Sequence, residues 1–466
     1  MSAVKYRLFG VGLKGKSPVV SSQHRINCYI ERVVDEEIEQ TAIIGSAGLD
    51  DFSDLGASPS RGKVEVENLL YVVNRNNLWE INNAGDRTSR GTLNTSSGRV
   101  DMFYDGDDVV TILDGTNGYT YTISTTTLAE ITDVDFPDAA PTGDFQDALY
   151  IAFGPNDTFQ IADDVTQWDA LDIANANVGA IVRGIADHGE LVIFGEKKVS
   201  FWVNTGGSDF PYQPIRGAEK EVGLAARWSL TKFDDSLAFL GRNSLGQVQV
   251  YKMQGHSPVL ISNPEFDSII NSYATVGDAT GFAYIDRGHP FYRLNFPSAG
   301  KSWEYDGLSG TWQERQSGTA GLRSRGEMAV DFLNKVRIFD YENGMIYTLN
   351  AETYDESGEQ FPFEITSRKI TNNFEPFSIN QVYLNFETGV GLATGQGSDP
   401  QVMLSCSRDG GQTWGTGVWK DLGPIGRYET RVQWDQFGTS ETFAFRVRIT
   451  DPVKRYLMNA AAIRAG

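Results

Sequence analysis

Short apolar segments recur along the first 350 residues at nearly constant spacing. Seven such segments start at positions 69, 109, 148, 191, 237, 291 and 336, with steps of 40, 39, 43, 46, 54 and 45 residues. Segments without polar alternation are typical of strands that are covered on both faces. A multi-strand repeat of about 40–50 residues predicts a β-propeller, in which each repeat forms one blade.

Each apolar segment is followed by a turn and then by a second strand that carries at least one aromatic residue. The turns contain residues that tolerate positive φ, such as Asn76-Asn77 and Asn343-Gly344. The second strands begin at Leu78, Tyr119, Phe159, Val199, Val248, Ser302 and Met345. Some units show a further strand upstream, so we expect blades of three visible strands and an inferred fourth. The number of blades stays open between six and seven.

The repeat ends near Asn350, and the character of the sequence changes there. A polar stretch at 351–360 is followed by segments that alternate between apolar and polar residues, at 362–370, 379–389, 402–410, 428–434 and 443–450. This alternation is expected of strands with one face in a core and one face in water. We therefore predict an all-β protein, with a propeller followed by a C-terminal β-sandwich or jelly-roll.

The predicted division of the chain is 1–62, 63–350 and 351–466. The first part is interpreted as an extended arm and entry to the propeller, which wraps the propeller or a neighbouring molecule. The alternative is that this part lends a strand to the last blade and so closes the ring.

Composition and charge narrow the function classes. The chain has 466 residues, of which 40% are hydrophobic and 22% charged, as in soluble folded proteins. The net charge is -21, from 61 acidic and 40 basic residues. Such a surface repels the phosphate backbone, which argues against tight DNA or RNA binding. No apolar run is long enough to span a bilayer and no export signal is visible, so we expect cytoplasmic synthesis and no stable membrane insertion.

Candidate catalytic and metal-binding motifs are few. Cys28 and Cys406 cannot form a disulfide framework, and the four histidines lack ligand spacing, so no metal or cofactor is expected. Residues 10–15 read G-x-G-x-x-G, but Pro18 and Val19-Val20 follow where a nucleotide site needs a helix. Acidic pairs such as Asp107-Asp108 fall at expected turns. No motif indicates a nucleophile together with a base that would activate it, so no catalytic residue is predicted.

The stretch from Ser407 to Trp414 matches the Asp-box pattern S-x-D-x-G-x-T-W. We interpret Ser407, Asp409, Gly411, Thr413 and Trp414 as a structural turn, in which Asp409 accepts hydrogen bonds from turn amides and Trp414 packs on the hairpin. A sialidase would need several such boxes, one per blade, together with an arginine cluster and a tyrosine nucleophile. Here there is one box, and it lies outside the repeat.

Four stretches together resemble the tail hub or nozzle proteins of short-tailed bacteriophages, the packaged-DNA stabilisation protein family. They are residues 23–31 (QHRINCYIE), the segment from Gly48-Leu49 to 59–62 (PSRG), the box at 407–415 and the tail 426–438, which continues into 443–461. Ala47 stands where the family often has proline. The resemblance covers most of the chain.

The resemblance implies a structural virion protein of the tail, without an active site. It would form a homo-oligomer, a ring of six copies beneath the portal and its adaptor ring. This ring would continue the DNA channel, help retain the packaged genome and dock tail fibres or spikes. Six copies at -21 each would carry about -126 charges, so DNA could pass through the lumen without binding. The alternative is a sialidase-like, carbohydrate-active or carbohydrate-binding propeller, which predicts monomers and an acidic, aromatic-lined pocket on the propeller axis.

Overall fold

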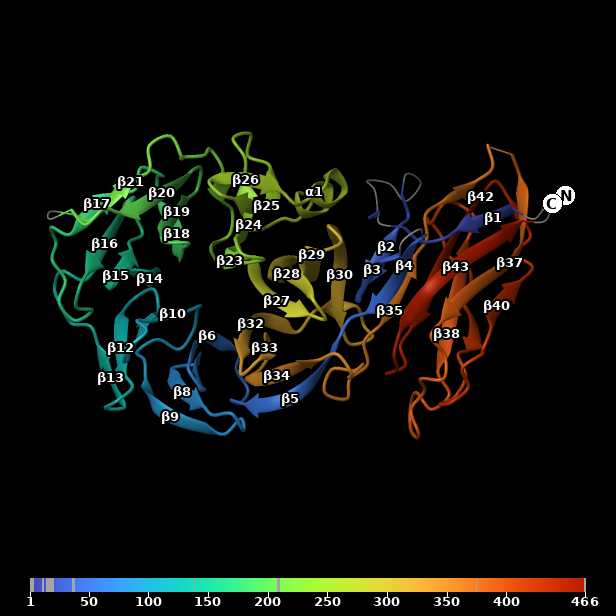
Figure 1. Ribbon diagram of the computed structural model, residues 1–466, viewed down its shortest axis with the longest axis horizontal. Helices are drawn as coiled ribbons and strands as arrows, with labels where there is room; N and C mark the ends of the chain where they lie inside the picture. The colour runs from blue at the N-terminus through green and yellow to red at the C-terminus, as the bar shows by residue number, and fades with distance from the viewer. Residues whose placement is uncertain are drawn as a thin grey trace.

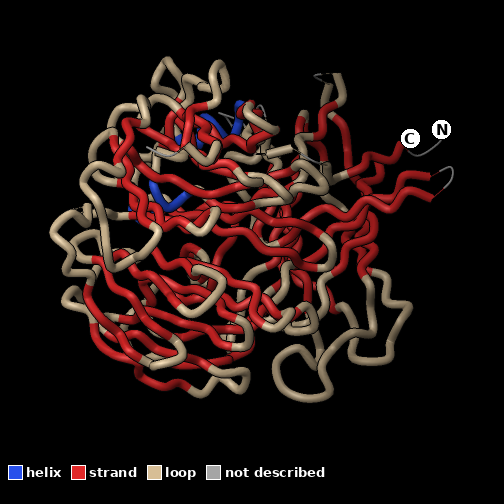
Figure 2. Tube along the Cα trace, turned by 60° about the vertical axis from the view of Figure 1, so that its left-hand side comes forward, coloured by secondary structure: helices blue, strands red, loops and turns tan. Residues whose placement is uncertain are grey.

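The computed structural model describes residues 4–10, 12–13, 21–35, 38–137, 139–207, 210–373 and 375–464. Its described residues form a ring of sheets with a two-sheet body packed against one side (Figure 1). Strands dominate both parts, and helix occurs in short pieces on the ring (Figure 2). These pieces are α1 (Pro264–Ile270), η1 (Arg227–Ser229) and η2 (Pro297–Ala299).

The ring consists of antiparallel units of four strands, one unit of which has a fifth short strand. Blade 1 contains β6 (Ser60–Val66), β7 (Leu69–Asn74), β8 (Asn77–Ile81) and β9 (Arg87–Thr92). Blade 2 contains β10 (Asp101–Tyr104), β11 (Val109–Leu113), β12 (Gly118–Thr122) and β13 (Thr127–Glu130). Blade 3 contains β14 (Thr142–Gln146), β15 (Leu149–Phe153), β16 (Thr158–Ala162) and β17 (Ile173–Asn175). Blade 4 contains β18 (Ile181–Asp187), β19 (Glu190–Gly195), β20 (Val199–Asn204) and β21 (Tyr212–Pro214).

The second half of the ring includes one blade shared with the rest of the molecule. Blade 5 contains β22 (Gly223–Leu224), β23 (Thr231–Lys232), β24 (Leu237–Arg242), β25 (Val248–Gln254) and β26 (Ser257–Leu260). Blade 6 contains β27 (Thr280–Asp286), β28 (His289–Phe296), β29 (Lys301–Asp306) and β30 (Thr311–Ser317), with β31 (Leu322–Arg323) at its edge. Blade 7 contains β32 (Gly326–Phe332), β33 (Lys335–Asp340), β34 (Met345–Asn350) and β5 (Gly48–Asp54). Six blades are separate sheets, and blade 6 is the one that continues into an 11-stranded sheet.

The propeller predicted from the repeat is confirmed, and the structure explains the repeat. The seven apolar segments are the second strands of the blades, such as β7 and β24. A second strand lies inside its sheet with a blade on either side. Both of its faces are therefore covered; Leu70, Tyr71, Val72 and Val73 are fully buried.

The first strands of the blades surround the centre of the ring (Figure 1). Neighbouring first strands contact one another from β6 through β10 and β14 to β18, and β27 contacts β32, which contacts β6. Side chains on these strands therefore line the propeller axis.

The described residues among the first 62 do not form one arm around the propeller. β5 pairs with β34, with Leu49 opposite Leu349, and thereby supplies the outer strand of blade 7. This is the strand-lending alternative considered above. The strands before β5 pair with strands from the other end of the chain, so both parts of the molecule contain N-terminal residues.

The second body is the predicted C-terminal sandwich, enlarged by N-terminal strands. One sheet contains β3 (Cys28–Asp35), β4 (Ile38–Gly45), β43 (Tyr456–Arg464), β37 (Phe377–Phe386) and β40 (Val432–Asp435), with β1 (Val4–Arg7) and β41 (Thr439–Ser440) at its side. The facing strands are β2 (His24–Ile26), β35 (Phe363–Thr366), β42 (Thr442–Ile449), β38 (Gln401–Ser407) and β39 (Val418–Asp421), with β36 (Ile370–Thr371). The core between them includes Val382, Phe445 and Val447, all fully buried.

Ring closure generates the first testable prediction. Gly48, at the start of β5, lies against the segment that follows the propeller, and a Cβ there would be 2.3 Å from the Asp355 carbonyl oxygen and 2.5 Å from that of Thr353. Because backbone atoms cannot move aside as a side chain can, Gly48→Ala should destabilise the protein by about 1–3 kcal/mol. The thermal midpoint measured by calorimetry checks this.

Gly277→Ala is the matched control, since a Cβ at Gly277 would meet only the Ala225 carbonyl oxygen, at 3.8 Å. Equal midpoints for the two variants would contradict the close packing described at Gly48.

Candidate functional site

A three-residue strand joins the propeller to the sandwich. β2 pairs in parallel with β30 of blade 6, where Ile26 lies opposite Glu314. On its other side β2 pairs antiparallel with β35 of the sandwich, from His24–Thr366 to Ile26–Glu364. Blade 6 and half of the sandwich are therefore one continuous sheet.

The residues around β2 are those of the QHRINCYIE motif, and their polar side chains secure the joint. Arg25 is 1% exposed and donates to the carbonyl oxygens of Gly10, Gly12 and Trp312 at 3.1, 3.2 and 2.9 Å. Asn27 donates to the carbonyl oxygens of Gln316 and Pro362, at 3.0 and 2.8 Å, and accepts from the Gln316 amide. One short segment thus contacts the blade, the sandwich and the N-terminal strand region.

The G-x-G-x-x-G segment, residues 10–15, belongs only in part to the described residues. Its glycines 10 and 12 offer their carbonyl oxygens to Arg25, whereas residues 11, 14 and 15 are not described. A nucleotide role for this segment gains no support from the two glycines, because their contacts belong to the joint.

Blade 6 has one apolar face and one polar face, and the polar face is buried. Tyr292, Leu294, Trp303 and Trp312 pack on the side of blade 5. The opposite face carries a cross-strand row in which Arg293 lies opposite Glu304, and Glu304 opposite Gln313. Strand alternation puts these two classes of side chain on opposite faces.

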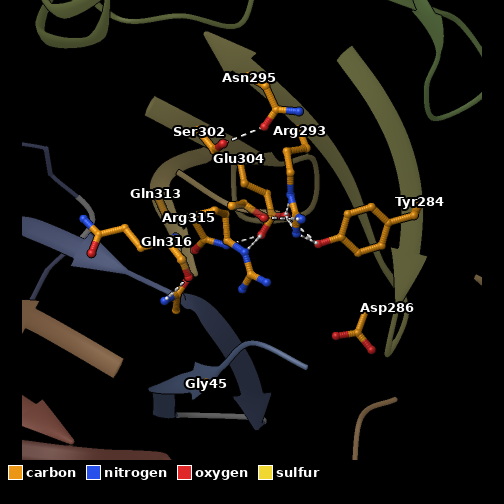
Figure 3. A network of polar contacts seen from close by, with 12 residues as sticks. Gly45, Tyr284, Asp286, Arg293, Asn295, Ser302, Glu304, Gln313, Arg315 and Gln316 are labelled. Atoms are coloured by element: carbon orange, nitrogen blue, oxygen red, sulfur yellow. Dashed lines mark hydrogen bonds and ion pairs between the residues drawn. The ribbon is translucent and has the colours of Figure 1, made fainter. Parts of the chain in front are cut away.

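Glu304 is the centre of this polar row (Figure 3). Arg293 donates to its Oε2 atom through Nε at 3.0 Å and Nη2 at 2.6 Å, and Gln313 donates to its Oε1 atom at 2.8 Å. The Tyr284 hydroxyl also donates to Glu304 and accepts from Arg293 at 2.8 Å. Arg293 contacts both Glu304 and Tyr284, and Tyr284 contacts Glu304, so these three side chains form one connected network. Gln313 joins this network through Glu304. Hydrogen bonds connected in this way, some of them to charged groups, strengthen one another.

The charge of Glu304 is maintained although the side chain is 1% exposed. Burial alone would raise the pKa of Glu304, but the charges of Arg293 and Arg315 and the hydrogen bonds from Tyr284 and Arg293 lower this pKa to about 2. The carboxylate is therefore ionised at every physiological pH.

Arg315 extends the row towards the segment that links the two bodies. Its Nε atom lies 3.9 Å from Glu304, and Nε and Nη1 have no hydrogen-bond partner among the described residues. The linker supplies Glu356, which is 1% exposed and accepts from Arg325 Nε at 3.0 Å. Burial raises the pKa of Glu356, opposed by the Arg325 charge.

A buried histidine lies between the blade and β3. His289 contacts Asp306 through Nδ1 at 3.0 Å and Glu31 through Nε2 at 2.7 Å. Burial by itself would lower the pKa of His289, but the hydrogen bonds and charges of Asp306 and Glu31 raise it. The imidazolium thus bridges a blade carboxylate and a carboxylate of the β3 strand. This stabilising contribution is complete at low pH and is lost as the pH rises through the raised pKa.

Two further charged side chains close the joint. Glu314 accepts from Lys301 at 2.7 Å and forms an ion pair with His24 at 2.9 Å. Burial would raise the pKa of Glu314, but the hydrogen bonds and charges of His24 and Lys301 lower it to about 2. Arg455, fully buried, donates to the carbonyl oxygens of Phe361 and Tyr354.

We call the following residues of these contacts the junction cluster: Arg25, Asn27, Glu31, Tyr284, His289, Arg293, Glu304, Asp306, Gln313, Glu314, Arg315, Arg325, Glu356 and Arg455.

A second charged site lies on the propeller axis. A cavity of about 380 Å³ is lined by residues from blades 1, 2, 4, 5, 6 and 7. Its charged residues are Lys63, Glu65, Arg99, Asp101, Arg183 and Asp331, and its aromatic residues are Trp228 and Phe282. No tyrosine is among the residues that line it. The axis therefore has charges of both signs, in contrast to the acidic aromatic pocket that the carbohydrate alternative predicts.

The predicted Asp-box residues lie together in a turn after β38. Asp409 accepts from the amides of Gln412 and Thr413 at 2.9 Å and from the hydroxyls of Ser407 and Thr413. These hydrogen bonds, the Thr413 hydroxyl first, hold the pKa of Asp409 below its usual range. Gly411 has φ of +96°, and the Trp414 ring lies 4.0 Å from the Arg446 guanidinium. Ser407 is buried, and the other four residues are exposed or half-buried.

The sequence interpretation did not identify the junction cluster. A signal was present in FYRLNF, a strand predicted to be covered on both faces, in which the polar residues Arg293 and Asn295 alternate with apolar ones. Among the described residues no group of three His, Cys, Asp or Glu side chains could hold a metal ion. Of the helices in the described ranges, none has the length and apolar character needed to cross a membrane.

The junction cluster generates a prediction about stability. Glu304→Gln removes the charge that Arg293 and Arg315 surround and leaves two buried guanidinium groups without it. We expect a loss of about 3–5 kcal/mol, as for other buried pairs broken on one side. Calorimetry of the full chain measures it, with Glu219→Gln, an exposed glutamate, as the control that should match the wild type. A Glu304→Gln midpoint equal to that of the control would contradict a central role for this carboxylate.

The pKa values of the junction give a pH dependence with a defined sign. Glu304 and Glu314 both titrate at about 2 in the folded protein, against an ordinary value of 4.5. Their contribution to stability is therefore complete above pH 4.5 and is lost as the pH falls towards 2. Thermal midpoints measured from pH 6 to pH 3 should fall steeply below about pH 4.5. Glu314→Gln should make this dependence shallower, and an unchanged slope in that variant would be inconsistent with the assignment.

Comparison with known proteins places the two bodies in one family. A family model described as bacteriophage P22 Gp10, beta-propeller, matches residues 30–354. A second, described as bacteriophage P22 Gp10, beta-sandwich, matches residues 362–465. No curated protein matches the chain.

Solved structures are similar to the propeller only at a general level. The WD40 propeller domain of Doa1 is 12% identical, with a TM-score of 0.42, over 65% of this chain and 97% of that one. The streptogramin B lyase structure is 12% identical, with a TM-score of 0.45, over 66% and 98%. Virginiamycin B lyase from Staphylococcus aureus is 13% identical, with a TM-score of 0.44, over 64% and 98%. These likenesses carry no argument about function.

The two family models cover most of the chain in the order propeller then sandwich, and they confirm the resemblance recognised from the four sequence stretches. The chain therefore belongs to the bacteriophage P22 Gp10 family and is a structural protein of a phage tail, which makes it a virion component.

Proposed function

We propose that this protein forms the hub or nozzle of a short phage tail, as a ring of six copies below the portal and its adaptor ring. The ring continues the DNA channel, helps retain the packaged genome and offers its outer surface to tail fibres or spikes. The observation that carries the proposal is the match of both bodies of the chain to one phage tail family.

The charge of the chain supports a channel that DNA passes without binding. Six copies at -21 each carry about -126 charges. Duplex DNA has one charge per about 1.7 Å of its axis, so an acidic wall repels it and no counterions are released on contact. The passage of DNA through the lumen is then non-specific.

The junction cluster supports the role of a rigid subunit in a ring. A sheet that continues from blade 6 into the sandwich, with buried charges on both sides of β2, resists rotation between the two bodies. Parts joined by a polar linker alone move relative to each other by default. A rigid subunit keeps the walls of the proposed channel in fixed positions.

The role we propose is non-enzymatic. The junction cluster has one hydroxyl in hydrogen-bond contact with a carboxylate, Tyr284 with Glu304, and both side chains are buried, Tyr284 at 9% and Glu304 at 1% exposure. The one neutral hydroxyl at the centre of the junction, that of Tyr284, is engaged by Arg293 and Glu304. The carbohydrate-active alternative is therefore not favoured by a specific observation.

Mass photometry of the purified full chain tests the assembly. We expect the protein mixed with its portal-bound adaptor ring to give a species heavier than the adaptor complex by six copies of 51.4 kDa, about 308 kDa. An unrelated acidic protein of similar mass, added in its place, should leave the adaptor complex unchanged. A chain that stays monomeric at every adaptor concentration would overturn the ring proposal.

A further inference from the structure

Three cations and one carboxylate are the charged lining residues of the axial cavity that are not exposed. The cations are Lys63 on β6, Arg99 just before β10 and Arg183 on β18, and the carboxylate is that of Asp101. Arg99 makes one long contact, Nη2 to the Glu327 carbonyl oxygen at 3.5 Å, and its ion pair with the Glu327 carboxylate is 3.8 Å long. The buried Nε atom of Arg183 has no hydrogen-bond partner among the described residues.

The carboxylates near these cations are already engaged. Asp101 accepts from Arg183 Nη2 at 3.3 Å and from the Gly143 amide at 3.2 Å. Glu327 accepts from Arg323 at 2.8 Å and from the Thr280 hydroxyl at 3.0 Å. Among the lining residues that are not exposed, the three cations therefore share one partly occupied carboxylate, that of Asp101, whereas buried donors in proteins usually have partners.

An aromatic ring orders the two guanidinium groups. The Arg99 and Arg183 guanidinium carbons lie 5.7 and 5.0 Å from the centre of the Trp228 ring. Both side chains are less than one-fifth exposed. Cations held on an aromatic ring keep their orientation without an anionic partner, which leaves their N–H groups available to one.

We propose that the axial cavity binds a small oxyanion, through phosphate or carboxylate oxygens that accept hydrogen bonds from Lys63, Arg99 and Arg183. Guanidinium groups donate to such oxygens in pairs, and an ammonium adds a third contact. The volume of about 380 Å³ suits a small molecule.

Two exposed acidic residues of the lining, which we call its acidic rim, restrict what can enter the cavity. Glu65 and Asp331, which also line it, are both exposed, and each raises the cost of bringing a second negative charge near. A polyanion such as duplex DNA is excluded by size and by this acidic rim. A compact anion with its charge on one or two groups passes the rim and reaches the three cations.

Lys63 gives the binding a measurable signature. Burial, followed by the charge of Arg183, lowers the pKa of Lys63 to about 8, while Asp101 and Glu65 oppose the shift and Arg99 adds to it. An oxyanion beside the ammonium favours its charged form. Binding at pH 8 is therefore expected to take up protons.

Isothermal titration calorimetry of the full chain with inorganic phosphate, and separately with citrate, tests the proposal. We expect saturable binding of at least one probe at pH 8, with proton uptake seen as a difference in heat between two buffers of different ionisation enthalpy. Phosphate binding identifies a phosphate site, and citrate binding alone identifies a carboxylate site.

Lys63→Met and Arg99→Gln should each weaken binding about tenfold, the loss of one charged hydrogen bond. Lys63→Met should also abolish the proton uptake. Lys335→Met, an exposed lysine on β33, is the control that keeps both signals. Unchanged far-UV circular dichroism and thermal midpoints without anion show that the variants are folded. Absence of saturable binding with both probes, or equal affinity in wild type and Lys63→Met, would overturn the proposal.

Discussion

The pairing of β2 with both β30 and β35 is the constraint on which the arrangement of this molecule depends. Three residues, His24 to Ile26, turn a propeller blade and half of a sandwich into one sheet. Backbone hydrogen bonds fix the distance and direction between neighbouring strands, so the two bodies have one relative position. Without β2, only the linker and side-chain contacts would join them.

Packing against blade 7 explains why so many charges are buried in blade 6. Tyr284 and Phe291 on the polar face of blade 6 pack with Ile338 of blade 7, and β2 covers the edge of β30, so this polar face has no access to water. Arg293, Glu304 and Arg315 then need one another, because an unpaired buried charge costs several kcal/mol in a real protein. Such networks add little net stability compared with an apolar core, but they accept only one geometry. Arg293 and Glu304 find their partners in this arrangement, whereas Arg315 Nε and Nη1 have none among the described residues, so the specificity of the junction rests on the Arg293–Glu304 pair.

The charged residues around the propeller axis are arranged differently from those of the junction cluster. There the first strands of the blades converge, and charged residues from separate blades meet without a backbone pairing between them. Arg183 and Asp101 pair across the axis, whereas Arg99 makes only a long hydrogen bond of 3.5 Å to the Glu327 carbonyl oxygen. A structural ring and a ligand cavity can therefore occupy the same blades, since the first is built from their outer strands and joints and the second from their inner strands.

The sequence by itself determined the propeller, because each second strand is covered on both faces and its apolar run shows this without reference to the rest of the fold. It also determined the sandwich strands such as 443–450, where alternation marks one wetted face, and the Asp-box turn, whose hydrogen bonds are local. It did not determine that blade 6 continues into the sandwich, that β5 closes blade 7, or that Arg293, Glu304, Arg315 and Glu356 meet. Those features arise from pairings between residues about three hundred or more positions apart, such as Leu49 with Leu349 and His24 with Thr366. Local periodicity describes how a strand is covered and carries no information about which strand covers it, so only the tertiary structure could decide them.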